Sequence, residues 1–168
     1  IDPPAALEML DRMDAYLRAT LSASRATAHP LSDEFARLED YLELMKVRMG
    51  ERLRYSLHLP KELAHIAVPS LILQPLVENS IKHGLEPKIT GGEVKVSAEW
   101  LNGRLRLSVA DTGVGMRAVA THASPGQGFG MAQLHERLST QFGGEITIEC
   151  VANNPEGTCV NMVFSVTN

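Results

Sequence analysis

The chain is poor in cysteine, in aromatic residues and in long apolar runs, and each shortage excludes a class of protein. Two cysteines among 168 residues, Cys150 and Cys159, are too few for a disulfide-stapled secreted domain. The net charge of −4 leaves no basic surface for a nucleic-acid backbone, so no nucleic-acid partner is predicted. No apolar run reaches the roughly 18 residues that a membrane-spanning helix needs. These absences favour a reduced, cytoplasmic globular domain.

Hydrophobic residues still make up 44% of the chain, which is enough for a substantial core. The chain opens on IDPP without an initiating methionine. We therefore expect it to be part of a longer protein, so that missing targeting signals say little about the parent.

Two amphipathic helices are predicted within residues 1–50, and Pro30 marks the start of the second. The stripe on the first helix consists of Leu7, Leu10, Met13 or Asp14, Leu17 and Leu21. The second stripe is a narrow seam of Phe35, Leu38, Leu42, Met45 and Met49. Two interpretations of this helical hairpin stay open: the stripes pack against a second copy of the chain, or they cover the domain that follows.

The stretch from Pro69 to Leu85 organises the rest of the chain. Pro69 suits the first position of a helix, and Pro75 is expected to kink its first turns. One arc of this helix is small or apolar and suited to packing on a sheet: Leu73, Leu76, Val77, Ser80, Ile81 and Gly84. The opposite arc is polar and carries Asn79, Lys82 and His83, with Glu78 on its shoulder.

This polar arc has two interpretations. An amide oxygen, a cation and an imidazole close together suit Mg²⁺ and the phosphates that it bridges. Alternatively, the segment is an ordinary surface helix on which Glu78 and Lys82 form an ion pair four residues apart.

Alternating apolar residues predict a sheet that is mostly antiparallel. We expect a strand at 54–59, a hairpin over 94–109 that turns at Asn102-Gly103, and two strands within 146–166. A further helix is predicted over 131–142. The fold class is therefore α+β, with helices on one face of the sheet.

Two glycine motifs flank a segment of small and polar residues at 117–127. Asp111 ends the predicted hairpin and begins DTGVGM, in which Gly113 and Gly115 would let a flat base approach the backbone. The second motif, GQGFGM, precedes a predicted helix and offers backbone N–H groups to phosphate oxygens. Alone, the first is better explained as an ordinary Asp-Thr-Gly turn, and the second equally well as a glycine hinge.

Together and in this order, the motifs resemble the ATP-binding fold of histidine kinases, gyrase B, Hsp90 and MutL. The resemblance covers Pro69 to about Val166. Within that superfamily, QPLVENSIKHG, DTGVGM, GFGMAQLHERL and the Gly-Thr pair at 157–158 resemble the LytS/YehU type of sensor histidine kinase. The segment LEDYLELMKVRMGERL resembles the linker of that type. The resemblance implies a Bergerat-type two-layer α/β sandwich preceded by a helical hairpin.

The resemblance also implies a role for single residues. Asn79 would bind Mg²⁺, Glu78 would orient the water of the metal, and Lys82 and His83 would lie near the phosphates; Glu78, Asn79 and Lys82 would be catalytic. Asp111 would accept a hydrogen bond from the adenine amine. The other nucleotide-binding residues would be Gly113, Gly115, Met116, Gly126, Gly128, Gly130, Met131 and Thr158. Thr158 would act through its hydroxyl, and 117–127 would be the lid over the triphosphate.

Two departures from the family pattern matter. Pro75 stands where gyrase-like ATPases carry a glutamate that activates water, so hydrolysis should be slow and transfer to a protein should be favoured. The Pro-His-Phe-x-Phe-Asn motif with the phosphoacceptor histidine is absent, and we expect it upstream of this chain. His29 and His135 are expected to be ordinary surface or interface histidines.

The implied function is the ATP-binding catalytic part of a sensor histidine kinase, with ATP and Mg²⁺ as cofactors. The parent would be a membrane-anchored homodimer that phosphorylates its own histidine and then the receiver domain of a response regulator. Residues 1–50 would be a truncated dimerisation and linker region, and residues 51–168 the catalytic domain. Alternatives are a serine kinase of the anti-sigma-factor type and a nucleotide-binding scaffold without transfer activity.

Overall fold

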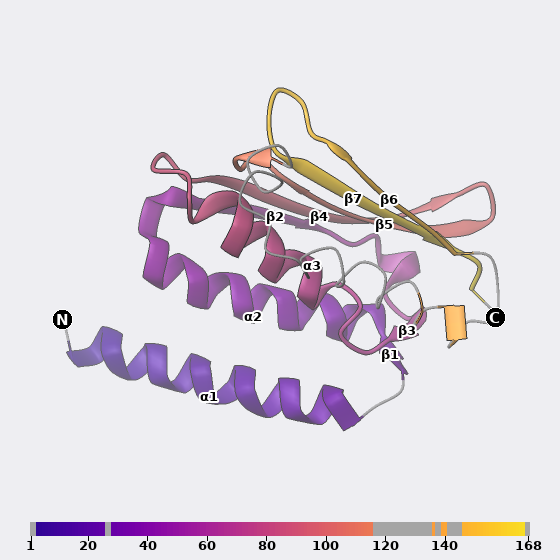
Figure 1. The fold of residues 1–168 in the computed structure, drawn as a ribbon. Coiled ribbons are helices and arrows are strands. Elements are labelled where there is room, and N and C mark those ends of the chain that lie inside the picture. The colour runs from indigo at the N-terminus through magenta and orange to yellow at the C-terminus, as the bar shows by residue number, and fades with distance from the viewer. Residues whose placement is uncertain (1–2, 26–27, 116–135, 137–138, 141–145, 167–168) are drawn as a thin grey trace.

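The computed structural model describes residues 3–25, 28–115, 136, 139–140 and 146–166 (Figure 1). The longer elements are, in chain order, α1 (Pro3–Arg25), β1 (Ala28–Pro30), α2 (Leu31–Met49), β2 (Leu53–His58), β3 (Ala67–Pro69), α3 (Gln74–Asn79), β4 (Gly92–Leu101), β5 (Arg104–Asp111), β6 (Ile146–Ala152) and β7 (Thr158–Phe164). Short 3₁₀ turns lie at Gly50–Arg52 and Lys61–Leu63, and a π-helical segment, η3 (Ser80–Leu85), continues α3.

The five-stranded sheet has the order β2-β4-β5-β7-β6. Its first pair, β2 with β4, is parallel, and the other three pairs are antiparallel. Helices α2 and α3 lie on the same face of this sheet, and α1 lies beyond α2 as an outer layer (Figure 1). The predicted α+β architecture with helices on one face is therefore confirmed.

The central hairpin follows the predicted alternation. Val94, Val96 and Ala98 of β4 are buried while their neighbours are more exposed, because successive side chains of a strand point to opposite faces. Asn102 and Gly103 connect β4 to β5 with φ angles of 51° and 77°. Two consecutive positive φ values are typical of the tight turn that matches the twist of a hairpin.

The stripes of the two N-terminal helices have different surroundings. The stripe of α2 belongs to the domain core, where Leu38 and Leu42 are completely buried. The stripe of α1 is exposed, with Leu7, Leu10 and Leu21 each at least 60% accessible. Thus α2 covers the sheet, which is one of the two interpretations that the sequence left open for the stripes, whereas the leucine stripe of α1 stays largely exposed.

The predicted start of the central helix is wrong. Pro69 ends β3, which pairs with β1 and brings Val68 opposite His29. The chain then turns through Leu71, whose φ is 60°, and α3 begins only at Gln74. Pro75 consequently lies in the first turn, where its missing N–H is not needed, so the predicted kink is also wrong.

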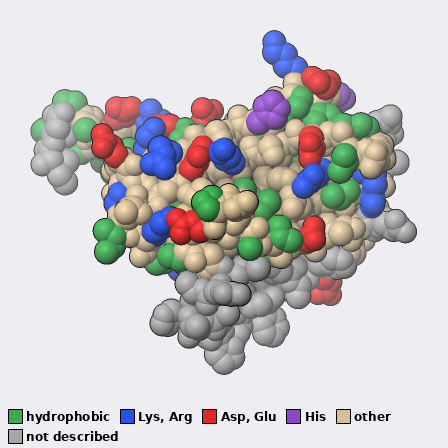
Figure 2. Space-filling model, turned by 90° about the horizontal axis from the view of Figure 1, so that it is seen from above, with side chains coloured by type: hydrophobic (Ala, Val, Ile, Leu, Met, Phe, Trp, Pro, Cys, Tyr) green, Lys and Arg blue, Asp and Glu red, His purple; other side chains and the backbone are tan. Residues whose placement is uncertain are grey.

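Several predicted features lie outside the described residues. These include the lid at 117–127 and most of the helix at 131–142, of which residues 136, 139 and 140 are helical. On the face seen in Figure 2, positive and negative side chains are interspersed, which agrees with the absence of a basic field in the composition. None of the helices in the described ranges is long and apolar enough to cross a lipid bilayer.

Candidate functional site

Asp111 extends the buried face of β5. The inward residues of this strand are Leu105, Leu107 and Val109, and Asp111 takes the next position in the same phase. Its carboxylate therefore enters the layer between sheet and helices, where the residue is only 4% exposed. Burying a carboxylate costs free energy unless donors surround it.

Three donors serve this carboxylate. The backbone N–H of Gly113 donates to Oδ1 at 2.9 Å, and the Ser80 hydroxyl and the backbone N–H of Thr158 also donate to the side chain. Burial raises the pKa of Asp111 above its ordinary value, and the three hydrogen bonds offset only part of that effect. A carboxylate can accept about four hydrogen bonds, so Asp111 retains capacity for one more donor.

Glycines allow the chain to close around Asp111. A Cβ at position 113 would lie 2.3 Å from the carbonyl carbon of Gly84, and a Cβ at position 157 would lie 1.9 Å from the backbone oxygen of Asp111. Val114 donates its N–H to the Gly84 oxygen at 3.0 Å, which ties the turn after β5 to η3. Gly113 is therefore required by a contact within the protein, and its expected approach to a base stays a prediction.

The backbone around Asp111 has further supports that the sequence did not reveal. The Asn153 side chain donates to the backbone oxygen of Asp111 at 2.8 Å. Lys88 donates to the carbonyl of Thr112 at 2.9 Å and pairs with Glu156. Because these residues lie far apart in the chain, only the sheet register could have placed them here.

The predicted phosphate-binding groups lie on the outer side of the same helical segment. Asn79 and Lys82 are exposed and His83 is half-buried. These side chains form no hydrogen bond or ion pair with the described part of the chain, unlike Asp111. Their orientation away from the core agrees with the predicted polar arc, and their roles toward metal and phosphate remain predictions.

The described residues contain no cluster of three or more histidine, cysteine or acidic side chains that would hold a metal ion by itself. One amide oxygen, that of Asn79, nevertheless fits Mg²⁺ in a nucleotide complex, since this ion usually keeps several waters and takes most other ligands from substrate phosphates.

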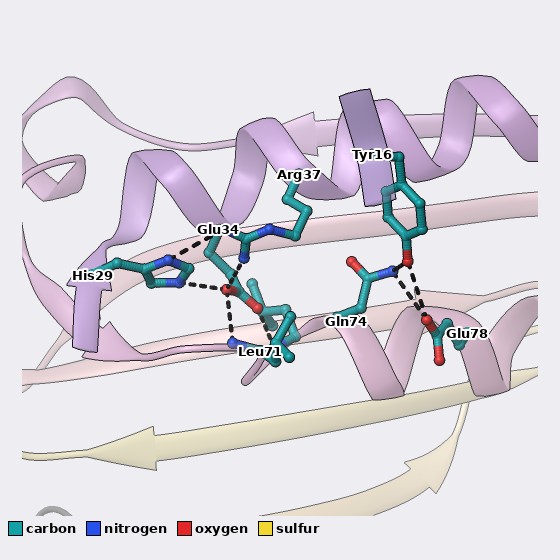
Figure 3. Close-up of polar contacts among 8 residues, drawn as sticks. Tyr16, His29, Glu34, Arg37, Leu71, Gln74 and Glu78 are labelled. Carbon is teal, nitrogen blue, oxygen red and sulfur yellow. Dashed lines mark hydrogen bonds and ion pairs between the residues drawn. The ribbon is translucent and has the colours of Figure 1, made fainter. Parts of the chain in front are cut away.

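Glu78 points toward the N-terminal helix (Figure 3). Its carboxylate accepts from Gln74 Nε2 at 3.1 Å and from the Tyr16 hydroxyl of α1 at 3.4 Å. Gln74 Nε2 also donates to the Tyr16 oxygen at 2.6 Å. The structure has this contact in place of the alternative ion pair between Glu78 and Lys82, and the proposed orientation of a metal-bound water by Glu78 is untested.

Other predicted residues have mixed outcomes. Gly115 has a φ of 79° and lies near Gly157, and Thr158 contacts Asp111 through its backbone N–H, so a role for its hydroxyl remains a prediction. The remaining nucleotide-binding candidates lie outside the described residues, as does His135: Met116, Gly126, Gly128, Gly130 and Met131.

Of the two expectations for His29, an ordinary surface or an ordinary interface histidine, the surface one is wrong. Its side chain is 8% exposed, and Nε2 lies 2.6 Å from a carboxylate oxygen of Glu34 (Figure 3). Pairing of β1 with β3 encloses the ring, and a strand of three residues gave no periodic signal in the sequence.

Comparisons with known families agree with this geometry. The family described as "Histidine kinase-, DNA gyrase B-, and HSP90-like ATPase" matches residues 67–168, which contain both parts of the candidate site. The family described as "Histidine kinase" matches residues 1–53.

The curated relatives are sensor proteins. The chain is 28% identical over 148 residues to the sensor histidine kinase YpdA of Escherichia coli, which covers 85% of this chain and 26% of that protein. It is 31% identical over 151 residues to the sensor histidine kinase BtsS of the same species, covering 89% and 26%. It is 25% identical over 178 residues to the sensor protein LytS of Oceanobacillus iheyensis, covering 100% and 30%. The chain thus spans less than a third of the length of these relatives.

Solved structures share the fold. The catalytic domain of the histidine kinase ThkA superposes with a TM-score of 0.60 at 16% identity, covering 84% of this chain and 98% of that one. ShkA in complex with AMPPNP gives 0.55 at 22% identity, covering 97% and 36%. ThkA in complex with the response regulator protein TrrA gives 0.57 at 17% identity, covering 96% and 49%.

Proposed function

We propose, because this chain belongs to the family of histidine kinase-, DNA gyrase B- and HSP90-like ATPases, that it binds Mg·ATP between η3 and the turn after β5. Within its parent protein it would transfer the γ-phosphoryl group of ATP to a histidine. The observation that carries this proposal is Asp111, a buried carboxylate with three internal donors and capacity for one more. An adenine amine would supply that donor.

The phosphates would extend from Asp111 toward the polar arc of α3 and η3. Asn79 would supply an oxygen ligand to the Mg²⁺ that the phosphates hold, and Lys82 would place a positive charge beside them. Both side chains are exposed and therefore accessible to a ligand.

Phosphoryl transfer to a protein is favoured over hydrolysis. Pro75 occupies the position where gyrase-like ATPases carry the water-activating glutamate, and proline can neither accept nor donate a proton. The domain would then work by holding ATP in line and neutralising charge. Support for a histidine acceptor comes from the relatives, which are named sensor histidine kinases.

The parent would pass its phosphoryl group to the receiver domain of a response regulator, a proposal supported by the ThkA–TrrA complex. We propose residues 1–50 as the dimerisation and linker region and 51–168 as the catalytic domain. The exposed leucines of α1 support a homodimer in which this stripe packs on a second copy. The chain would lie on the cytoplasmic side of a membrane-anchored parent.

Calorimetric titration of Mg·ATP into the wild type, Asn79→Ala and Asp111→Asn tests the proposal. We expect saturable binding by the wild type and a loss of at least about tenfold in affinity for each variant. Equal binding by all three proteins would show that the assigned site is wrong. No binding by the wild type would favour a scaffold that keeps the fold without the ligand.

A further inference from the structure

Glu34 is a buried carboxylate that the proposed ATP chemistry does not use. It lies in the first turn of α2 and is 1% exposed. Its oxygens accept the backbone N–H of Leu73 at 2.8 Å and that of Leu71 at 3.2 Å (Figure 3). One side chain of α2 therefore holds the segment that leads into α3.

Local interactions alone do not fix the backbone conformation of this segment. Leu73 is the residue before α3, and no side chain of the helix caps its N-terminus. Leu71 has a φ of 60°, a left-handed conformation that a leucine adopts only when its surroundings impose it. Helix α3 has six residues before its hydrogen-bond pattern changes to that of the π-helical η3, so few α-helical hydrogen bonds fix where it begins.

The charge of Glu34 is balanced inside the protein. Arg37 Nη1 lies 3.4 Å from Glu34 Oε2, and Arg37 Nη2 lies 3.5 Å from His29 Nδ1. Because arginine has only donors, Nδ1 must accept, and we assign the ring proton to Nε2, which donates to Glu34. The carboxylate thus has four donors around it, and any shortening of its side chain would remove it from some of them.

We propose that Glu34 is a positioning residue of the nucleotide site, which rests on the proposed binding of ATP. By fixing Leu71 and Leu73, it sets the start of α3, and Asn79 follows only about 9 Å further along the helix. A shift of the start would therefore move the amide oxygen of Asn79, the group that would bind Mg²⁺ in a nucleotide complex. Asp111 lies on β5, and its donors Gly113 and Thr158 lie outside the helical segment, so the adenine end is affected less than Asn79, even though its third donor, Ser80, directly follows Asn79.

The test compares Glu34→Asp with Glu39→Gln, which removes an exposed carboxylate from the same helix. Aspartate keeps the charge beside Arg37 and His29 but is shorter by about 1.5 Å, so it cannot reach both N–H groups. Calorimetry measures the affinity of each protein for ADP with Mg²⁺ and with EDTA, after circular dichroism has verified folding.

We expect Glu34→Asp to bind Mg·ADP about tenfold more weakly than the wild type and to lose no more than about threefold in affinity for ADP in EDTA, because Gly113 and Thr158 keep Asp111 in place while Ser80 can shift. Glu39→Gln should match the wild type in both. Equal losses with Mg²⁺ and EDTA would indicate a merely structural role and overturn the inference, as would wild-type affinity for Mg·ADP. No nucleotide binding by the wild type would instead overturn the proposed function together with this inference.

Leu71→Gly provides a second test that does not depend on a buried charge. Glycine adopts the left-handed conformation freely, so this variant should fold, but it loosens the segment that Glu34 holds. We expect a loss of about threefold in Mg·ADP affinity and a clearly smaller loss in EDTA. An unchanged Mg²⁺ dependence would contradict the proposed role of the segment.

Discussion

The two ends of the candidate site are built in opposite ways. At the adenine end, Asp111 is buried, bonded to three donors and enclosed by glycines. At the phosphate end, Asn79 and Lys82 are exposed and have no partner within the described residues. Among the described residues, the end around Asp111 is thus formed by internal contacts, whereas the side chains at the proposed phosphate end are open to a ligand.

This difference separates stability from function. Residues with internal partners contribute to folding as well as to binding, so their replacement affects both. Residues that face solvent contribute to binding alone. Substitutions at the two ends can therefore be recognised by whether the free energy of unfolding changes together with the affinity for Mg·ATP.

Gly113→Ala should have the largest effect. Its Cβ would lie 2.3 Å from the carbonyl carbon of Gly84, so the turn after β5 must separate from η3. We expect the free energy of unfolding to fall by about 3 kcal/mol or more. Gly103→Ala is the matched control, because its Cβ meets nothing within 4 Å and only the φ of 77° opposes it, at a cost of about 1 kcal/mol.

Urea unfolding of both variants measures these costs. Similar values for Gly113→Ala and Gly103→Ala would mean that the contact with Gly84 is loose, and the adenine end would then be no more preformed than the phosphate end.

Asp111→Asn and Asn79→Ala compare the two ends directly. Both should lower the affinity for Mg·ATP at least about tenfold, but Asp111→Asn should also lower the free energy of unfolding by about 1 kcal/mol, because its amide nitrogen faces a donor. Asn79→Ala should change stability by less than about 0.5 kcal/mol, since the side chain is exposed. Thermal unfolding without nucleotide distinguishes them, and a destabilised Asn79→Ala would contradict the comparison.

The pH dependence of stability should reveal the burial of Asp111. Burial raises the pKa of its carboxyl in the folded state above the unfolded value of about 3.9. At a pH between the unfolded and the folded pKa, the folded state therefore binds more protons than the unfolded state. Protonation of Asp111 therefore increases the free energy of unfolding as pH falls through the folded pKa. Above that pKa the carboxyl is charged in the folded state, and the full cost of burying the charge lowers stability.

Unfolding of the wild type and Asp111→Asn, followed from about pH 7 down toward the unfolded pKa of about 3.9, isolates this group, because other carboxylates titrate in both proteins. The wild type should gain stability relative to the variant as pH falls. An opposite trend would mean that the three donors outweigh burial.

Local patterns in the sequence predicted the elements that depend on neighbouring residues. The hairpin at Asn102-Gly103 and the position of Asp111 follow from alternation and turn chemistry. The small and polar arcs of the central segment also agree with burial in the structure, since both depend only on helical spacing.

Contacts between distant residues were not predictable in this way. Pro69 and Pro75 were assigned to the wrong places because β3 pairs with β1, far away in the chain. Glu34 is 39 residues from Leu73, and nothing in its local sequence indicates that it holds the start of α3. Similar leucine stripes likewise predicted α1 and α2 without showing that only α2 enters the core.

Thr158→Val should have the smallest effect, and it tests whether the hydroxyl of Thr158 belongs to the nucleotide site. Valine keeps the shape of threonine and the backbone N–H that donates to Asp111, and it removes only the hydroxyl. We expect the free energy of unfolding to change by less than about 0.5 kcal/mol and the affinity for Mg·ATP by no more than about threefold. Calorimetry and thermal unfolding measure both quantities. A tenfold loss of affinity without destabilisation would show that the hydroxyl contacts the nucleotide. The adenine end would then contain a group that, like Asn79, contributes to binding and not to stability.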